Sequence, residues 1–422
     1  MQKIVLTLST LLVATGISLG APDNPNPRII GVGARALALA GNYTALARDF
    51  SALYYNPAGL GFVKAREAHV GLNGFVTRGV SGLEDSVSEE SNERLRLSSG
   101  GLVWAVPTSR GGLALAGGYF SPYVFDEAYQ YASGSSETFD YRRRISHGQL
   151  NQWAFGFGLQ VAPGLSGGLS VSLLTGSSET YNTVESRAGG QVLDLDDDSY
   201  RRNATRSYLG YDVRVGFIYD IGTIASIGAR FVFPRRIRFK GTLEEQYPAL
   251  PTDSSWEVDD PGRMTMSYEG ALSGAVKLPF LVLAPEVAFR APDVSEDDST
   301  DAAYWKIAAG IGAEVPVANT GLVFRAGYRF SEYDHQPMRV EYGVEGEKNP
   351  EPILDEVSDI LNQQHLSGGL AYLSKSSLLF ELSYGYTLWG YTLHDPTLLT
   401  TRDGIEQRFG FHQVLFSVSL RY

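Results

Sequence analysis

The strongest constraint in this chain is a residue-by-residue alternation between large apolar side chains and polar or very small ones. It is clearest in LLFELSYGYTLWGY, residues 378–391. Alternate positions of this segment are apolar: Leu378, Phe380, Leu382, Tyr384, Tyr386 and Leu388. A period of two predicts a β-strand with one apolar face. The pattern recurs in YWKIAAGIGAEVP (304–316), GLVFRAGYRF (321–330), QWAFGFGLQV (152–161) and YDVRVGFIYD (211–220).

The composition of the polar face of these strands distinguishes between two kinds of all-β protein. In a soluble sandwich the apolar face forms a core and the polar face meets water. Here the polar face is rich in glycine and carries single charges, in a chain with 47 Gly and 19% charged residues. This suits a barrel whose apolar face touches lipid and whose crowded polar face lines a lumen. The alternation therefore predicts an all-β, antiparallel transmembrane β-barrel.

The spacing of the segments predicts the size of the barrel. We expect roughly 14 strands, with short connections such as residues 107–111 alternating with long polar ones such as 79–94, 126–148 and 331–364. Outer-membrane barrels have tight periplasmic turns and long external loops, so both chain ends should lie at the periplasmic end. In the last long loop, PILDEVSDIL has apolar residues at helical spacing and predicts a helix over 353–361.

The chain divides into three predicted parts. Residues 1–20 have a basic start, an apolar run and a small-residue pattern before Ala21, as in a secretory signal peptide. Residues 67–422 form the barrel. A barrel of about 14 strands is too wide for its own side chains to fill. Residues 21–66, mainly helical or irregular, are therefore the predicted plug, or hatch, inside the lumen.

The predicted plug contains RDFSALYYNPAGLGF, residues 48–62. Asparagine bonds to local backbone and proline fixes φ, so the Asn-Pro pair predicts a stiff turn. The candidate hatch residues are Asp49, Asn56, Pro57, Ala58, Gly59 and Leu60. They either take part in gating or form only a helix and turn that precede the barrel.

Composition excludes several classes of function. The net charge of −12 argues against nucleic acid as a partner, because phosphate binding needs clustered Lys and Arg. The chain has no Cys, and its six His are scattered, so we expect no metal and no cofactor. GLSGG, residues 164–168, matches a nucleophile-elbow motif only formally, because it joins two strands. We therefore expect no enzymatic activity.

The segment GARALALAGNYTALARDFSALYYNPAGLGF, residues 33–62, resembles the N-terminal signature of the FadL-type outer-membrane transporters of hydrophobic compounds, and of related Asn-Pro-Ala-Gly-Leu barrels. The resemblance implies a 14-stranded barrel with a hatch, and diffusive uptake of long-chain fatty acids or hydrocarbons. It also implies a sideways exit where the third strand is kinked. The matching strand here is GGLALAGGYFSPYVF, so the candidate opening residues are Gly117, Gly118 and Pro122. Alternatively, they are ordinary barrel glycines and a proline at the edge of a loop.

A carboxylate head group inside the barrel would need a positive partner, because an unpaired buried charge is costly. The candidates on inner faces of adjacent strands are Lys306, Arg325 and Arg329. Alternatively, they pair within a network that holds the wall and hatch together, with Glu314, Glu286, Glu381 or Asp212 as partners.

Three functions stay open from the sequence. The first is passive uptake of a hydrophobic small molecule by a monomer in contact with outer-membrane lipid and lipopolysaccharide. The second is a barrel partner of a secretion or surface-attachment system. The third is a membrane-embedded hydrolase. An apolar cavity beside the hatch with an interrupted third strand would favour the first, and a sealed wall would favour the second.

Overall fold

A computed structural model describes most of the chain. The described residues are 28–29, 31–83, 86–134, 138–188, 191–192, 200–246, 255–259, 261–291, 305–332, 339–342, 356–394 and 405–422. The predicted signal peptide lies outside them.

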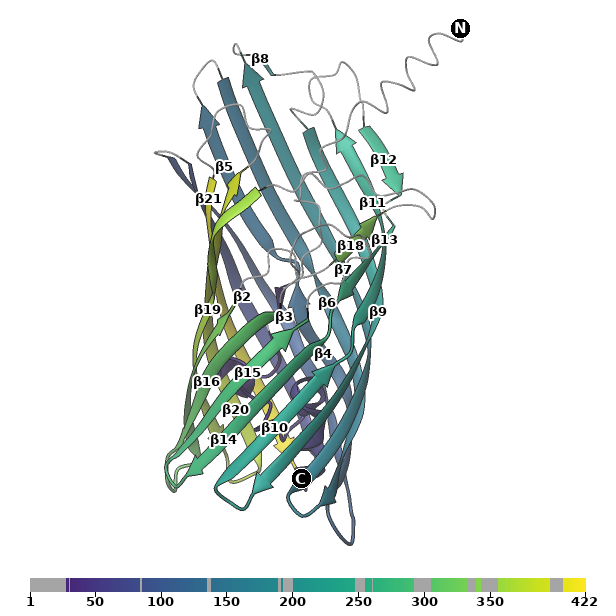
Figure 1. Cartoon of the computed structure of the whole chain (residues 1–422), viewed down its shortest axis with the longest axis vertical. Coiled ribbons are helices and arrows are strands. Elements are labelled where there is room, and N and C mark those ends of the chain that lie inside the picture. The colour runs from purple at the N-terminus through teal and green to yellow at the C-terminus, as the bar shows by residue number, and fades with distance from the viewer. Residues whose placement is uncertain are drawn as a thin grey trace.

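The described strands form one closed antiparallel barrel of 14 wall strands (Figure 1), which confirms the predicted fold class. The first wall strand, β2, pairs with β3 on one side and with the last strand, β21, on the other, and this closes the ring. Some wall strands consist of two segments, as where β10 and β11 both pair with β9.

The first half of the wall contains β2 (Glu67–Leu83), β3 (Ser86–Val106), β4 (Leu113–Val124), β5 (Glu127–Gly134), β6 (Thr138–Ala162), β7 (Leu165–Ala188), β8 (Gln191–Val192), β9 (Tyr200–Ile221), β10 (Ala225–Val232) and β11 (Arg235–Gln246). The second half contains β12 (Ser255–Asp259), β13 (Gly262–Met266), β14 (Glu269–Leu278), β15 (Leu281–Arg290), β16 (Lys306–Pro316), β17 (Leu322–Ser331), β18 (Arg339–Tyr342), β19 (Glu356–Leu373), β20 (Leu378–His394) and β21 (Ile405–Arg421).

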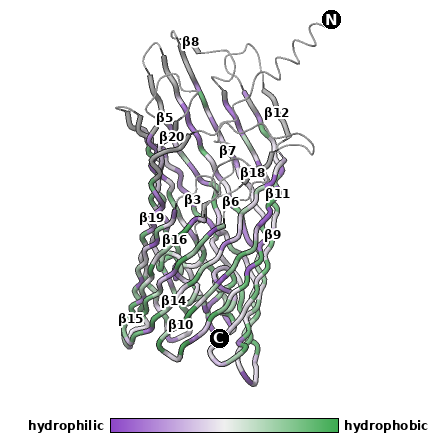
Figure 2. The backbone as a smooth tube through the Cα atoms, in the orientation of Figure 1, coloured by the Kyte–Doolittle hydropathy of each residue, from purple (hydrophilic) through white to green (hydrophobic). Residues whose placement is uncertain are grey.

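The two faces of the wall follow the predicted alternation in the half that holds the short turns. On β9, Tyr211, Phe217 and Tyr219 are each about half exposed, whereas Asp212 and Arg214 between them are almost fully buried. Apolar side chains outside and charges inside are the reverse of a soluble protein, and they identify the outer face as the lipid-facing one. Figure 2 shows this hydrophobic colouring gathered in the lower half of the wall.

On the opposite side of the membrane the strands continue much further than predicted. β6 has 25 residues and β7 has 24. The predicted loops 79–94 and 126–148 therefore consist largely of paired strand. The predicted helix over 353–361 is also wrong where it is described, since β19 begins at Glu356 and pairs with β20, with Val357 opposite Leu393. Ile353 and Leu354 lie outside the described residues.

The segment before β2 fills the lower lumen (Figure 1). It contains β1 (Arg28–Ile29), the short helices α2 (Ala34–Ala38) and α3 (Ala52–Tyr55), and the 3₁₀ helix η2 (Pro57–Phe62). Almost every residue from Val32 to Gly61 is buried. The segment leaves the lumen at Arg66, which exchanges backbone hydrogen bonds with the C-terminal Tyr422. None of the described helices is long and apolar enough to cross a membrane.

Glycines on the inner face of the wall make room for this plug. A Cβ on Gly158 would lie 2.5 Å from the backbone nitrogen of Gly61 and 2.6 Å from the carbonyl oxygen of Pro57. Comparable close approaches of plug atoms occur at Gly168, Gly216, Gly228, Gly310, Gly312 and Gly327. The glycine-rich polar face that the sequence shows is therefore the surface against which the plug packs.

Gly158→Ala tests this packing. The added methyl group would push against plug backbone, and overpacking of this kind costs about 1–3 kcal/mol. We expect a lower unfolding midpoint and faster proteolysis of the plug region in the folded barrel. Gly368→Ala is the matched control, because its Cβ would meet no atom closer than 3.6 Å. Equal stability of the two variants would contradict tight packing of the plug against the wall.

Candidate functional site

Asn56 fixes the start of η2 and joins the plug to the wall. Its side-chain Oδ1 accepts a hydrogen bond from the backbone N–H of Ala58 (3.2 Å), which caps the helix. Its Nδ2 donates to the carbonyl oxygens of Thr44 (2.9 Å), in the plug, and of Phe217 (3.1 Å), in β9. Asn56 is fully buried, so this side chain connects two plug turns with the wall.

The other residues of the Asn-Pro-Ala-Gly-Leu motif are packed as tightly as Asn56. Pro57 occupies the first helical position, where the missing N–H carries no penalty. Gly59 lies against the carbonyl group of Ala47, and a Cβ there would overlap that oxygen. Ala58 and Leu60 are fully buried. The motif is a rigid insert; a role in gating stays a prediction.

Asp49 organises the turn between α2 and α3. Its Oδ1 accepts hydrogen bonds from the Ser51 backbone N–H (3.0 Å) and hydroxyl (2.5 Å), and its Oδ2 accepts one from the Tyr43 hydroxyl (2.5 Å). Burial acts to raise the pKa of Asp49, but the nearby Arg35 charge and these hydrogen bonds lower it overall. Burial raises the pKa of Tyr43. The turn therefore keeps an ionised Asp49 next to a neutral Tyr43.

A chain of ion pairs joins the plug to the wall. Arg35 contacts both oxygens of Glu314 at 2.7 and 2.8 Å, and Arg325 contacts the same carboxylate at 2.8 Å. Arg325 also donates to Glu381 at 2.7 Å. The side chains of Glu314, Arg325 and Glu381 are each less than one-tenth exposed. Buried charges need such partners, so the network holds α2 against β16, β17 and β20.

A second group of contacts holds the plug through Glu286. Its carboxylate accepts hydrogen bonds from the backbone N–H groups of Tyr43 and Thr44, both at 2.9 Å, and pairs with Arg329 at 3.3 Å. Arg325 and Arg329 are thus both part of a network that joins the wall to the hatch, which was the alternative to a direct contact with a substrate head group. Arg329 and Lys306 also line a cavity, whereas Arg325 does not.

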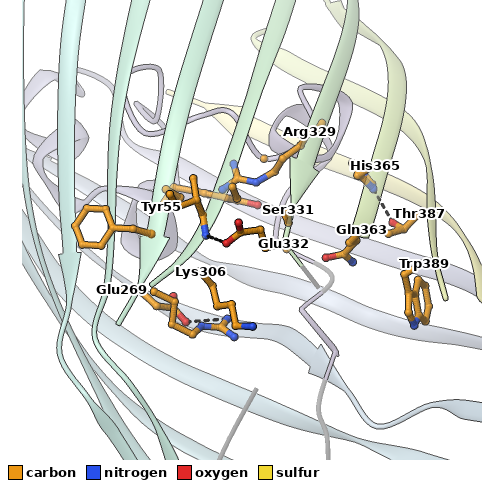
Figure 3. A pocket seen from close by; sticks show the side chains of 18 of the residues that line it. Tyr55, Glu269, Lys306, Arg329, Ser331, Glu332, Gln363, His365, Thr387 and Trp389 are labelled. Atoms are coloured by element: carbon orange, nitrogen blue, oxygen red, sulfur yellow. Dashed lines mark hydrogen bonds and ion pairs between the residues drawn. The ribbon is translucent and has the colours of Figure 1, made fainter. Parts of the chain in front are cut away.

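The cavity lies above the plug and has a volume of about 320 Å³. Its floor includes Leu37, Tyr54 and Tyr55 of the plug. Figure 3 shows Lys306, His365 and Trp389 on the surrounding strands and Glu332 just after the end of β17. Its charges lie next to opposite charges or hydrogen-bond donors: Arg290 pairs with Glu269 at 3.3 Å, and Glu332 accepts from the backbone N–H of Ile307 at 2.8 Å. The lining is therefore amphipathic rather than purely apolar, with aromatic rings beside cationic groups.

Further apolar side chains face the lumen beyond the plug. We call them the lumenal apolar cluster; it includes Tyr123, Phe125, Tyr208, Phe239, Met264 and Met266. Met266 belongs to both this cluster and the cavity lining. On β11 the alternation is inverted relative to the lipid-facing band, because Ile237 and Phe239 are buried while Arg236 and Arg238 are exposed. An apolar surface therefore continues from the cavity into the outer lumen.

The third wall strand is interrupted. The ladder between β3 and β4 runs from Val106–Leu113 to Ser99–Phe120, and no pairing between these strands continues beyond it in the described residues. On the other edge of β4, the register with β6 shifts between Phe120 and Tyr123, so Ser121 and Pro122 form a bulge. Gly117 and Gly118 lie inside the regular ladder. Of the three predicted opening residues, only Pro122 lies at the interruption.

Where its ladder with β4 has ended, β3 is joined to the neighbouring strands by side chains. Arg96 of β3 donates to the carbonyl oxygen of Gly148 (2.7 Å) and pairs with Asp126 (2.8 Å). Asn92 of β3 contacts Asp126 (3.3 Å) and the His147 ring (2.9 Å). We call Arg96, Asn92, Asp126 and His147 the polar clasp. Contacts between side chains separate more easily than a strand ladder, so the break is the weak line of the wall.

Both the plug and the cavity reach the strand break. Backbone pairing places β1 beside β4, with Ile29 opposite Tyr123 and Arg28 opposite Val124. Because β6 occupies one edge of β4 here, β1 occupies the edge that β3 leaves. Asp126 of the clasp and the adjacent Glu127 line the cavity. The start of the plug, the cavity and the break therefore form one continuous site.

Neither the polar clasp nor the inward-facing Arg214 and Arg230, two arginines that line the cavity, were among the predicted site residues. Alternation within YDVRVGFIYD places Arg214 on the inner face, so that residue could have been found from the pattern. The clasp has no local signal, because Arg96 and Asp126 are 30 residues apart in the chain.

Arg325→Met tests the ion-pair network. Removing this cation leaves Glu314 with one partner fewer and Glu381 without its arginine, and breaking a buried pair costs about 3–5 kcal/mol. We expect a clear loss of stability in urea titrations followed by heat-modified gel mobility. Arg408→Gln is the control, since the Arg408–Glu406 pair is more than half exposed and should contribute little. Equal midpoints would contradict the network.

Solved structures of the same architecture include two toluene transporters, TodX of Pseudomonas putida and TbuX of Ralstonia pickettii. TodX has a TM-score of 0.63 at 14% identity, over 94% of this chain and 99% of its own. TbuX has a TM-score of 0.57 at 13% identity, over 94% and 99%. A FadL homologue of Pseudomonas aeruginosa has a TM-score of 0.61 at 13% identity, over 94% and 99%.

No family model matches the sequence, and no curated protein matches it. At 13–14% identity the structural likeness shows the fold alone. The fold expected from the N-terminal resemblance is confirmed: the chain has the same plugged, 14-stranded barrel fold as these channels.

Proposed function

We propose that this protein lets hydrophobic molecules cross the outer membrane by diffusion, and that they leave sideways through the strand break between β3 and β4. The proposal rests mainly on one observation: the cavity above the plug is bounded by Asp126, a member of the polar clasp, and by the adjacent Glu127. A molecule held in this cavity is next to the end of the β3–β4 ladder.

The lining of the cavity supports an amphipathic substrate, such as a long-chain fatty acid. Tyr54, Phe289 and Trp389 offer apolar surface, worth roughly 25 cal/mol for each Å² buried. Lys306, Arg329 and Arg230 offer positive charge at the same cavity. A plain hydrocarbon would use only the apolar part. Toluene is named for the transporters TodX and TbuX, and hydrocarbons stay the second substrate class for this chain.

The other two functions have less support. A sealed wall would favour a secretion partner, but the β3–β4 ladder stops at Ser99 in the described residues. A hydrolase at the lipid interface would need an accessible Ser–His pair. The described His69 contacts Ser99 and Ser419, each at 2.9 Å, inside the barrel and stacked on Phe50 of the plug at 5.1 Å. This histidine is packed as a structural side chain.

Uptake by cells tests the main proposal. Bacteria that lack their own fatty-acid porin and express this chain should accumulate a labelled long-chain fatty acid faster than cells with an empty vector. Labelled toluene tests the second substrate class in the same cells. No increase with either compound, in cells with folded barrel in the outer membrane, would overturn the proposed function.

Lys306→Gln tests the head-group contact. Loss of a charge-assisted contact worth about 1.4 kcal/mol lowers affinity about tenfold. We expect that weakening for a long-chain carboxylate and no change for the alcohol of equal chain length, measured by fluorescence titration of the purified barrel. Lys375→Gln, in an exposed turn, is the matched control. Equal effects on acid and alcohol would contradict a head-group role.

A thiol cross-link tests the sideways exit. The chain has no Cys, so Asn92→Cys with His147→Cys gives a unique pair across the clasp. Bridging the two thiols with dibromobimane should stop uptake while the cavity still binds the compound. Each single-cysteine variant, treated alike, should transport normally. Unchanged uptake in the bridged protein would exclude an exit through this break.

A further inference from the structure

Four cations stand together on the outer face of the wall, just beyond the lipid-facing band. Arg236, Arg238 and Lys240 occupy alternate outward positions of β11, and Arg263 of β13 is directly opposite Arg238 in the pairing. All four are exposed. We call them the basic ladder. Alternate residues of a strand lie about 7 Å apart, so the four charges form one compact patch.

No described acidic side chain pairs with any of the four. The described salt bridges use other cations, including exposed ones such as Arg78 with Glu89 and Arg408 with Glu406. The register also places Glu341 of β18 opposite Arg263, on the far side from Arg238. Like charges directly opposite each other destabilise a sheet. Among the described side chains, Arg238 and Arg263 therefore face each other without an acidic partner, and an anion from outside the chain would stabilise this arrangement.

The position of the basic ladder indicates which kind of anion would bind there. Leu209, opposite Arg238, is 57% exposed, and Phe233, which precedes β11, is 42% exposed. Both belong to the lipid-facing band. On the other side of the ladder β9 presents the polar, exposed residues Ser207 and Thr205. The ladder thus lies where the exposed apolar residues of the wall give way to exposed polar ones, on the side of the lipid-facing band away from the short turns.

We propose that the basic ladder binds the phosphate groups of an outer-leaflet lipid, with lipopolysaccharide as the occupant. Its acyl chains would lie on the apolar band below, and its phosphates would accept hydrogen bonds from the guanidinium and ammonium groups. Arginine suits this role because its planar fork matches phosphate oxygens. The site is on the outer surface and is separate from the cavity and the strand break.

The test compares lipids that differ only in phosphate. The full-length barrel in detergent is titrated with bisphosphorylated lipid A and with the same lipid A after dephosphorylation. We expect at least about tenfold tighter binding of the phosphorylated form. Neutralising all four positions, with R236Q, R238Q, K240Q and R263Q, should remove that difference. R238Q with R263Q alone should give an intermediate loss.

Two controls make the result decisive. R78Q with R408Q removes two exposed arginines that already pair with acids, and it should keep the preference for phosphate. Inorganic pyrophosphate should not displace the lipid. A wild-type barrel that binds both lipid forms equally, a fourfold variant that keeps the preference, or displacement by pyrophosphate would each overturn the proposal. Heat-modified gel mobility verifies that every variant is folded, and the assay needs no transport.

Discussion

Backbone hydrogen bonding is the constraint on which the rest of this structure depends. In hydrocarbon an unpaired N–H or C=O costs on the order of several kcal/mol, so the wall must close, as β2 and β21 do. The end of the β3–β4 ladder departs from this rule. It is tolerated because other groups occupy the free edges: β1 pairs with β4, and Arg96 bonds to Gly148 and Asp126. The strand break is therefore stabilised by β1 of the plug segment and by the side chain of Arg96.

Ion pairs and charge-assisted hydrogen bonds fix the position of the plug in the lumen, which apolar packing alone would not do. The plug packs its apolar residues, such as Leu39 and Phe50, into one cluster with inner wall residues. Such contacts have little direction. The ion pairs through Glu314 and the two N–H bonds to Glu286 are directional and fix the rotation of α2 and the following turn. These contacts hold α2 in one orientation, and with it Leu37, which belongs to the floor of the cavity.

The part of the barrel inside the membrane could be predicted from sequence because lipid imposes one rule, apolar side chains outward. Beyond the membrane that rule ends. Charged segments such as 141–147 looked like loops but are paired strand, with Arg143 bound to Glu90 across strands. On β11 the apolar residues turn inward. The charge network joins Arg35 to Glu314, 279 residues apart, and no local pattern signals such a contact. The wall residues Glu314, Arg325 and Glu381 were among the candidates, but Arg35 of the plug was not predicted.

The inner face of the wall and the surface of the plug are complementary in shape, because glycines of the wall lie where plug atoms approach closely. A wall residue such as Gly158 has no freedom to acquire a side chain unless the turn at Pro57 retreats, and the turn cannot retreat because Asn56 ties it to β9. Each half therefore limits which substitutions the other accepts. Transplanting a hatch between barrels of this fold would demand exchange of the matching wall glycines as well.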